Sequence, residues 1–82
     1  MSEGWCVYVL RCGDGTLYTG ITNDVLRRVS AHQGGTASKY TRSRRPVSLV
    51  LEEPVPDRAA ALRREAEIRR LTRKQKLELI DG

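Results

Sequence analysis

The sequence is poor in the residues that build large cores, metal clusters and membrane spans. Its 82 residues include no Phe, one Trp, one His and two Cys. No run approaches the ~18 apolar residues of a membrane-spanning helix, and the start of the chain lacks the basic segment and small-residue cleavage site of a signal peptide. We therefore expect one small domain over residues 1–82, cytoplasmic and without a membrane partner.

The two cysteines, Cys6 and Cys12, are unsuited to a disulfide or a zinc site. On one extended strand, the six residue steps from Cys6 to Cys12, at ~3.3 Å each, separate the two by ~20 Å, whereas a disulfide needs Cα atoms within about 7 Å. Two Cys and one His at these spacings do not form a zinc site. The thiols are therefore expected to be free, as in a reducing compartment.

The chain is strongly basic. Its 15 Lys+Arg residues against 10 Asp+Glu give a formal net charge of +5. This balance favours a polyanionic partner, with nucleic acid ahead of an anionic membrane. A loop at 34–46 combines cations for phosphates with an aromatic ring for a base or sugar, although a merely solvated loop has the same composition. Its candidate nucleic-acid-binding residues are Lys39, Tyr40, Arg42, Arg44 and Arg45.

The pattern of apolar, capping and turn residues predicts the element order β-β-α-β-α-α. Val- and Tyr-rich runs predict strands at 5–12, 16–22 and 47–53, the last ended by prolines. Helical spacing and caps predict helices at 25–33, 58–71 and 73–80. The expected fold is α/β (α+β), a small three-stranded antiparallel sheet flanked by three helices.

Two tyrosines flank the turn Gly13-Asp14-Gly15. A three-residue hairpin loop there, with Gly supplying a left-handed position, pairs Tyr8 with Gly20. Tyr8 and Tyr18 then lie on one sheet face as diagonal neighbours, and Gly20 leaves space beside the Tyr8 ring. A register shifted by one residue would separate the two phenols.

Helix 25–33 carries a polar pair beside its apolar stripe. The stripe consists of Val25, Leu26 and Val29. Arg28 and His32 are four residues apart and share a face, with Arg27 as the adjacent alternative to Arg28. An Arg and a His so placed can bind a phosphate and transfer a proton, but they can equally form a solvated polar face.

Helix 58–71 places a carboxylate among apolar residues. At ~100° per residue, one arc of this helix contains Ala61, Leu62, Ile68 and Thr72. Glu65 lies at the middle of this arc and therefore needs a partner. An ion pair with Arg69 or Arg58 would satisfy it, and a metal ion at the mouth of a cleft is the functional alternative.

These features together resemble the GIY-YIG nuclease superfamily, from about Trp5 to Ile80. CVY at 6–8 stands where the family has GIY, and YTG at 18–20 stands where it has YIG. LRRVSAH matches the family's arginine helix and ALRRE its glutamate helix. KYTRSRRPVSLV and IRRLTRKQKLELI are similar to the smallest branch, stand-alone bacterial proteins.

The resemblance implies a set of site residues. Tyr8, Tyr18, Arg28 and His32 match the catalytic positions, Arg28 rather than Arg27 because it lies four residues before the His. Glu65 matches the single metal-binding glutamate. The family then implies one divalent ion, Mg²⁺ or Mn²⁺, bound through this carboxylate and water. Tyr18 would act as general base, and Tyr8 would orient the attacking water or its neighbours.

The function expected from this resemblance is metal-dependent hydrolysis of phosphodiesters, with DNA favoured over RNA. Many relatives have an Asn after the glutamate helix, whereas the one Asn here is Asn23. Larger members carry a separate DNA-targeting domain, so either a partner protein supplies specificity or cleavage is non-specific. The main alternative is a non-catalytic nucleic-acid-binding adaptor that keeps the scaffold. A protein-interaction role through the Arg-rich second helix is a third.

Overall fold

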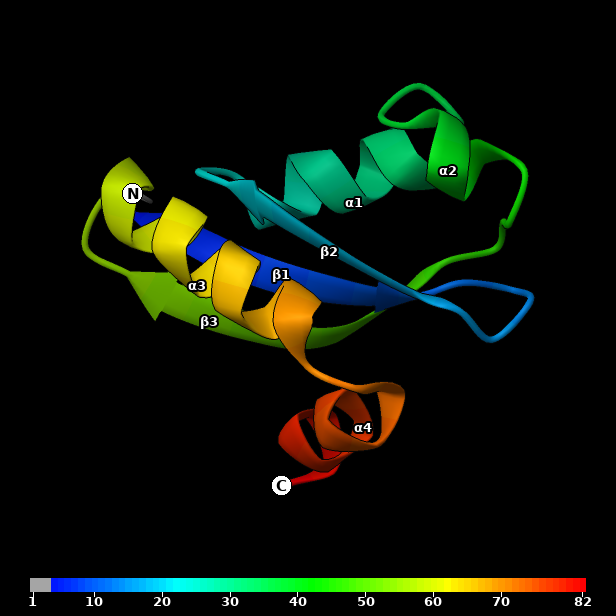
Figure 1. The fold of residues 1–82 in the computed structure, drawn as a ribbon. Helices are drawn as coiled ribbons and strands as arrows, with labels where there is room; N and C mark the ends of the chain where they lie inside the picture. Colours follow the sequence, from blue (N-terminus) through cyan, green and yellow to red (C-terminus); the bar gives the residue numbers. More distant parts are fainter. Residues whose placement is uncertain (1–3) are drawn as a thin grey trace.

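The computed structural model describes residues 4–82 and contains the expected three-stranded antiparallel sheet with helices on both faces (Figure 1). Residues 1–3, which include the start of the segment examined for a leader, lie outside the described part. The strands are β1 (Trp5–Arg11), β2 (Leu17–Thr22) and β3 (Ser48–Val55). The helices are α1 (Val25–Gln33), α2 (Lys39–Arg42), α3 (Arg58–Arg70) and α4 (Arg73–Asp81).

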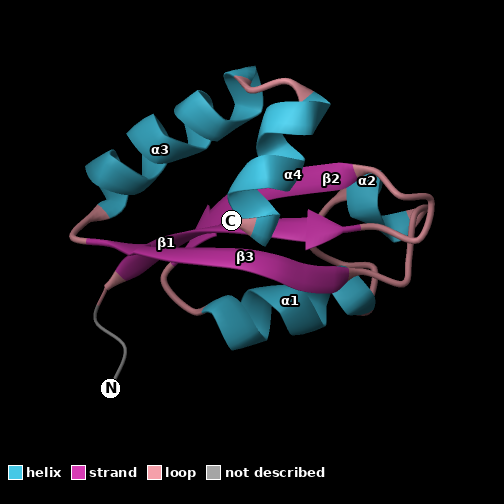
Figure 2. Ribbon diagram, turned by 90° about the horizontal axis from the view of Figure 1, so that it is seen from below, coloured by secondary structure: helices cyan, strands magenta, loops and turns pink. Residues whose placement is uncertain are grey.

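The sheet has the order β2-β1-β3, so that β1 is central and β2 forms an edge. Figure 2 shows α1 on one face of the sheet and α3 with α4 on the other. Because alternate residues of a strand face opposite sides, β1 serves two cores. One buried cluster consists of Val7, Val9, Ala61 and Ile68. The other consists of Tyr8, Leu10, Cys12 and Val47.

The hairpin adopts the predicted register. The amide of Cys12 donates to the carbonyl of Thr16 at 2.9 Å, and Gly15 has φ +86°. A positive φ is inexpensive for glycine alone, which explains its position in the loop. Tyr8 therefore pairs with Gly20, as predicted from the loop length.

Local sequence signals also set the helix ends. The side chain of Asp24 caps α1 and that of Asp57 caps α3, while Thr72 and Gln75 form the predicted capping box of α4. Each cap satisfies amides that have no partner within the helix. Cys6 and Cys12 are both buried free thiols, in line with the prediction. Within residues 4–82, no helix combines the length and apolarity needed to cross a membrane.

Two predicted boundaries were wrong. The loop at 34–46 contains the short helix α2, whose first amides are capped by Ser38. Strand β3 continues through Pro54 to Val55 instead of ending before the proline. Proline lacks the amide needed in the middle of a sheet, but β3 is an edge strand and tolerates it there.

Two predicted core residues are exposed instead. Leu26 on α1 is 79% exposed and Leu62 on α3 is 41% exposed. The inward face of α1 is formed instead by Val25, Val29 and the buried His32. His32 therefore faces the sheet and lies beside Tyr8 of β1.

Candidate active site at the edge of β2

A buried chain of hydrogen bonds joins β1, α1 and α2. The hydroxyl of Tyr8 lies 2.8 Å from Nε2 of His32, and Nδ1 of His32 lies 2.7 Å from Oγ1 of Thr41. Thr41 in turn donates to the carbonyl of Ser38 at 3.4 Å. Tyr8, His32 and Thr41 are each at most 2% exposed. Three separate segments are thereby fixed to one another through polar groups shielded from water.

The direction of these bonds assigns the protons. Because the Thr41 hydroxyl donates to Ser38, it accepts from Nδ1–H of His32, which leaves Nε2 to accept from the Tyr8 hydroxyl. Burial lowers the pKa of His32, and the guanidinium of Arg28 lowers it further. The imidazole is therefore neutral at pH 7, and both ring nitrogens are occupied within the protein. A buried ring so engaged orients Tyr8 and has no nitrogen left for a phosphate.

The pKa of Tyr8 is raised well above its usual range. Burial is the largest cause, followed by the neighbouring Tyr18, while the charge of Arg28 opposes the rise and that of Glu65 adds to it. Tyr8 is therefore a protonated hydrogen-bond donor at neutral pH.

Gly20 gives the Tyr8 ring its place. A Cβ atom at this position would lie 2.5 Å from the Tyr8 hydroxyl oxygen and 2.6 Å from Cζ. The ring thus covers the space that any side chain would fill, as expected from the pairing of Tyr8 with Gly20. Close packing of this kind is intolerant of even one added carbon.

Tyr18 lies beside the same cluster and connects it to α2. Its ring centroid is 6.5 Å from that of Tyr8 and 5.0 Å from that of His32. The ring of Tyr40 follows at 5.7 Å, with the guanidinium of Arg44 stacked 3.9 Å from its centroid. The two phenols are thus neighbours on one sheet face, as the hairpin register predicts. Tyr40 has an aromatic neighbour in Tyr18 and a cation over its ring.

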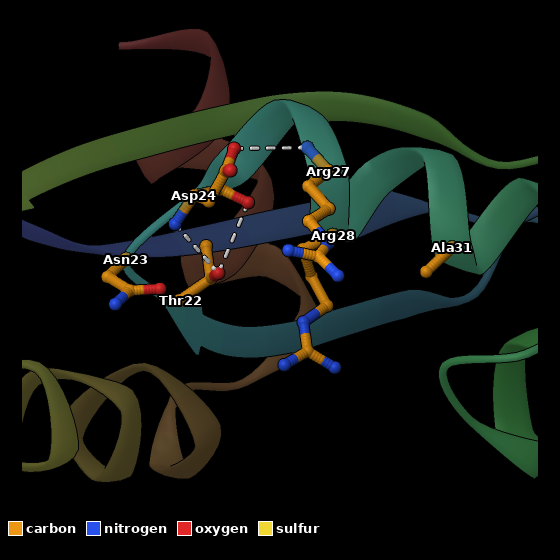
Figure 3. A pocket seen from close by; sticks show the side chains of 6 residues that line it. All are labelled: Thr22, Asn23, Asp24, Arg27, Arg28 and Ala31. Atoms are coloured by element: carbon orange, nitrogen blue, oxygen red, sulfur yellow. Dashed lines mark hydrogen bonds between the residues drawn. The ribbon is translucent and has the colours of Figure 1, made fainter. Parts of the chain in front are cut away.

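Arg28 is exposed and extends from α1 across the ribbon of β2 (Figure 3). It lies one helical turn before His32 on α1, and its charge lowers the pKa of both Tyr8 and His32. Among residues 4–82 the ion pairs involve Arg44, Arg64 and Arg69. The guanidinium of Arg28 is consequently available to an anionic ligand, and the same holds for its neighbour Arg27.

Glu65 is 16% exposed and pairs with Arg69, whose Nη2 lies 3.2 Å from Oε2. The same Nη2 donates to the carbonyl of Thr19 at 3.3 Å, which ties α3 to β2. The ion pair between Glu65 and Arg69, one of the two predicted alternatives, is therefore present in the structure. Through Arg69 the carboxylate is nevertheless linked to β2 next to Tyr18.

A divalent ion is compatible with Glu65. Within the described residues, no group of three or more His, Cys, Asp or Glu could hold a metal ion, so Glu65 belongs to no such cluster. Mg²⁺ commonly uses one or two carboxylates and fills its remaining positions with water and substrate phosphate. Oε1 of Glu65 has no hydrogen bond within residues 4–82, whereas Oε2 would have to be shared with Arg69. The donor chemistry fits, with Arg69 as a competing cation.

The basic segment is divided between structural and free cations. Arg44 pairs with Asp14 at 3.0 Å, and Arg45 donates to the carbonyls of Arg42 and Gln33. These two arginines hold the segment in place. Two exposed cations, Lys39 and Arg42, make no side-chain hydrogen bond or ion pair with the described residues.

Two polar residues that position the site were not predicted from the sequence. Thr41 holds His32, and the amide of Gln33 bonds both the carbonyl and the amide of Val47, at 2.8 and 2.9 Å. The signal available for Thr41 was weak. It follows Ser38 by three residues in a segment whose helix has only four residues.

Comparison with known proteins gives a consistent result. The GIY-YIG catalytic domain family matches residues 4–78. A UPF0213 protein of Staphylococcus epidermidis is 50% identical over 74 residues, covering 90% of each chain. A UPF0213 protein of Streptococcus sanguinis is also 50% identical over 74 residues, which cover 90% of this chain and 85% of the relative.

Two solution structures resemble the whole fold. The UPF0213 protein BH0048 from Bacillus halodurans gives a TM-score of 0.62 at 42% identity, covering 96% of this chain and 84% of that chain. The protein EF2693 from E. faecalis gives 0.65 at 38% identity, with the same coverage. The names of these relatives assign no reaction, so the chemistry must be inferred from the residues.

Proposed function

The chain belongs to the GIY-YIG catalytic domain family, and from this premise we propose that it is a metal-dependent endonuclease that hydrolyses phosphodiester bonds, with DNA favoured over RNA. The observation that carries the proposal is the convergence on Tyr8. Tyr18 and His32 adjoin this phenol, and Arg28 lies one helical turn before His32 on α1. Arg69 bonds both Glu65 and the carbonyl of Thr19, which follows Tyr18 on β2. Residues from both faces of the sheet therefore act on one site.

In this mechanism Arg28 binds the phosphate and offsets the charge that develops on its non-bridging oxygens. Its guanidinium has no ion pair among the described residues and can form two parallel bonds to phosphate. A divalent ion held by Glu65 would polarise the phosphate and stabilise the leaving oxygen. Arg69 would give up its share of the carboxylate on binding of that ion.

The two phenols take different roles. The proton of Tyr8 points to Nε2 of His32 and its ring is buried, so that Tyr8 positions its neighbours around the attacking water. Its raised pKa excludes it as a base. Tyr18, whose hydroxyl has no hydrogen bond within residues 4–82, is the phenol left to take the proton of that water.

One observation favours a second function, a nucleic-acid-binding adaptor without turnover. Arg69 already neutralises Glu65 at 3.2 Å. If this ion pair persists when nucleic acid binds, no metal ion enters and the scaffold binds without cutting. In either case specificity could come from a partner protein.

A cleavage assay separates the two functions. The protein is incubated with single-stranded, nicked, branched and duplex DNA and with RNA, with Mg²⁺ or Mn²⁺ or with chelator. We expect cleavage that requires the metal ion and is lost in Glu65→Ala, while binding of the substrate persists. Glu67→Ala is the matched control, because Glu67 lies on the same helix but is exposed and pairs with Arg64.

The outcomes are distinct. Cleavage that survives in Glu65→Ala would contradict the site, and cleavage lost equally in Glu67→Ala would indicate damage to α3 rather than loss of a metal ligand. Binding without cleavage of any substrate and with either ion would favour the adaptor. Absence of binding would overturn both functions.

A further inference from the structure

A hollow of about 590 Å³ lies where β2 ends and α1 begins (Figure 3). Its volume falls within the range of about 300–1,000 Å³ that is typical of ligand sites. Its lining is largely polar and contains two guanidiniums. The lining residues are Thr22, Asn23, Asp24, Arg27, Arg28 and Ala31.

The charge of this hollow is available to a ligand. Arg27 and Arg28 are exposed, and neither takes part in an ion pair within residues 4–82. The one carboxylate of the lining, that of Asp24, accepts from the backbone amide of Arg27 at 3.2 Å as the cap of α1. The amides of Arg27 and Arg28 are thus both bonded to Asp24, and the positive charge of the lining is that of the two side chains.

The hollow adjoins the candidate active site. Arg28 lines it and lies one helical turn before His32, whose ring bonds the Tyr8 hydroxyl at 2.8 Å. A phosphate bound by Arg28 at the tyrosines would therefore have its neighbour in the same strand directed along the lining. Arg27 is the second cation that this strand would meet there.

We propose that this hollow binds the nucleotide next to the cleaved bond, with Arg27 contacting the flanking phosphate and Asn23 the sugar or base. The carboxamide of Asn23 offers two donors and one acceptor, which suits these groups. The assignment rests on the proposed function, since it takes nucleic acid as the ligand. It adds a strand-binding subsite to the residues that carry out the reaction.

The salt dependence of binding tests this subsite without any cleavage. Wild-type protein and variants are titrated, with chelator present, against a fluorescein-labelled DNA single strand and the matching duplex at several salt concentrations, by fluorescence anisotropy. Each phosphate contact contributes about 0.7 to the slope of log K against log salt for a single strand and about 0.9 for a duplex. We expect Arg27→Ala to lower the slope by about one contact and Arg27→Lys to retain it.

The matched control is Arg11→Ala. Arg11 is exposed and lies at the end of β1, opposite Leu17 in the strand register. Thr22, which lines the hollow, lies opposite Cys6 at the other end of the same two strands, so Arg11 is remote from the hollow. Its loss removes the same charge far from the hollow and should leave the slope unchanged. We expect Asn23→Ala to weaken binding several-fold with no change in slope, because the residue is uncharged.

The results distinguish the subsite from the proposed function. Equal slopes for Arg27→Ala and Arg11→Ala would overturn the subsite, while cleavage by the wild type would still support a nuclease. A wild type that fails to bind either DNA would instead overturn the proposed function. Unfolding midpoints of the variants within the error of the wild type are expected, since both arginines are exposed.

Discussion

The pairing of Tyr8 with Gly20 shows how much one absent side chain can decide. The phenol of Tyr8 lies against the position of the missing Cβ, 2.5 Å from it, and its hydroxyl is 2.8 Å from Nε2 of His32. A side chain at position 20 would prevent the Tyr8 ring from lying there. The glycine therefore has a packing role for the site, although it contributes no chemistry.

We predict that Gly20→Ala displaces the Tyr8 ring and costs about 1–3 kcal/mol of unfolding free energy, as overpacking of a core typically does. Urea denaturation measures the loss of stability. The ¹⁵N chemical shift of His32 Nε2 should change, because its hydrogen bond to Tyr8 is weakened. Gly34→Ala is the control, because its Cβ would meet the Ser30 carbonyl at a tolerable 3.4 Å. Equal stability of the two variants would contradict the packing role.

The lowered pKa of His32 makes stability depend on pH. Burial and the charge of Arg28 hold this pKa below its ordinary value of 6.5, while Tyr8, Tyr18 and Thr41 are its uncharged neighbours. The unfolded chain then binds a proton more readily than the folded one. The contribution of neutral His32 to the unfolding free energy is therefore complete above pH 6.5, and it is lost as the pH falls from 6.5 toward the pKa of His32 in the folded protein.

We expect the unfolding free energy to fall over this range with a slope of at most about 1.4 kcal/mol per pH unit from this residue. His32→Gln removes the titrating group, so its curve should be flatter just below pH 6.5. Denaturation at closely spaced pH values gives both curves. Parallel curves would mean that His32 does not titrate as inferred.

At the scale of elements, α2 is small but connects the basic segment to the site. Thr41 is fully buried and holds Nδ1 of His32 at 2.7 Å, and Tyr40 lies against Tyr18. A segment that binds nucleic acid at its exposed cations would thus be coupled to the buried phenol. The coupling consists of the hydrogen bonds from Thr41 to His32 and from His32 to Tyr8.

We predict that Thr41→Val, which keeps the shape but removes the hydroxyl, leaves Nδ1–H without an acceptor and costs about 1–3 kcal/mol. Thr41→Ser should restore both stability and the Nδ1–H tautomer. The ¹⁵N shifts of the His32 ring report the tautomer directly. If the valine variant retained the wild-type shifts, the proposed direction of the hydrogen-bond chain would be wrong.

Helix α3 approaches the site from the other face of the sheet through Arg69, which bonds Glu65 and the carbonyl of Thr19. Because Arg69 is 57% exposed, its ion pair is worth only about 0.2–1 kcal/mol. We predict that Arg69→Gln raises the affinity for Mn²⁺ by up to about fivefold, the same free energy expressed as a ratio. Free Mn²⁺ is followed by electron paramagnetic resonance.

Two controls accompany this measurement. Arg70→Gln changes an exposed neighbour that forms no ion pair among the described residues and should leave the affinity unchanged. Glu65→Gln should abolish the binding. Weaker Mn²⁺ binding in Arg69→Gln would show that the arginine supports the metal site and does not compete with it.

Local signals explain what could be predicted from the sequence. The Gly-containing loop determined the hairpin register and hence the shared face of Tyr8 and Tyr18, and the caps at Asp24 and Asp57 set two helix starts. These features depend on residues a few positions apart.

Features set by distant contacts could not be predicted in the same way. The passage of β3 through Pro54 depends on its place at the sheet edge, and the exposure of Leu62 depends on where α3 meets the sheet. The hydrogen bond of Thr41 requires α1 and α2 to meet first. For Glu65, helical periodicity left the ion pair and the metal ligand open, and the structure contains the ion pair without excluding the ligand.

At the scale of the whole molecule, the narrow sheet is what lets opposite faces contribute to one site. Helices α1 and α3 lie on opposite sides of it (Figure 2), yet β2 is an edge strand and Arg69 reaches its Thr19 carbonyl. Side chains from both helices can therefore meet at this edge. A wider sheet with further strands beyond β2 would keep Arg28 and Glu65 apart.

The distribution of charge then predicts how the whole protein binds nucleic acid. The cations without ion pairs on α1 and α2, next to the site, are Arg27, Arg28, Lys39 and Arg42. Four phosphate contacts would give a slope of about −3.6 for log K against log salt on duplex DNA, or a loss of roughly 100-fold between 50 and 200 mM salt. Titration of labelled duplex over this range measures it. An affinity that stays flat would contradict nucleic acid as the partner, because the net charge of +5 would then have no counterpart in binding.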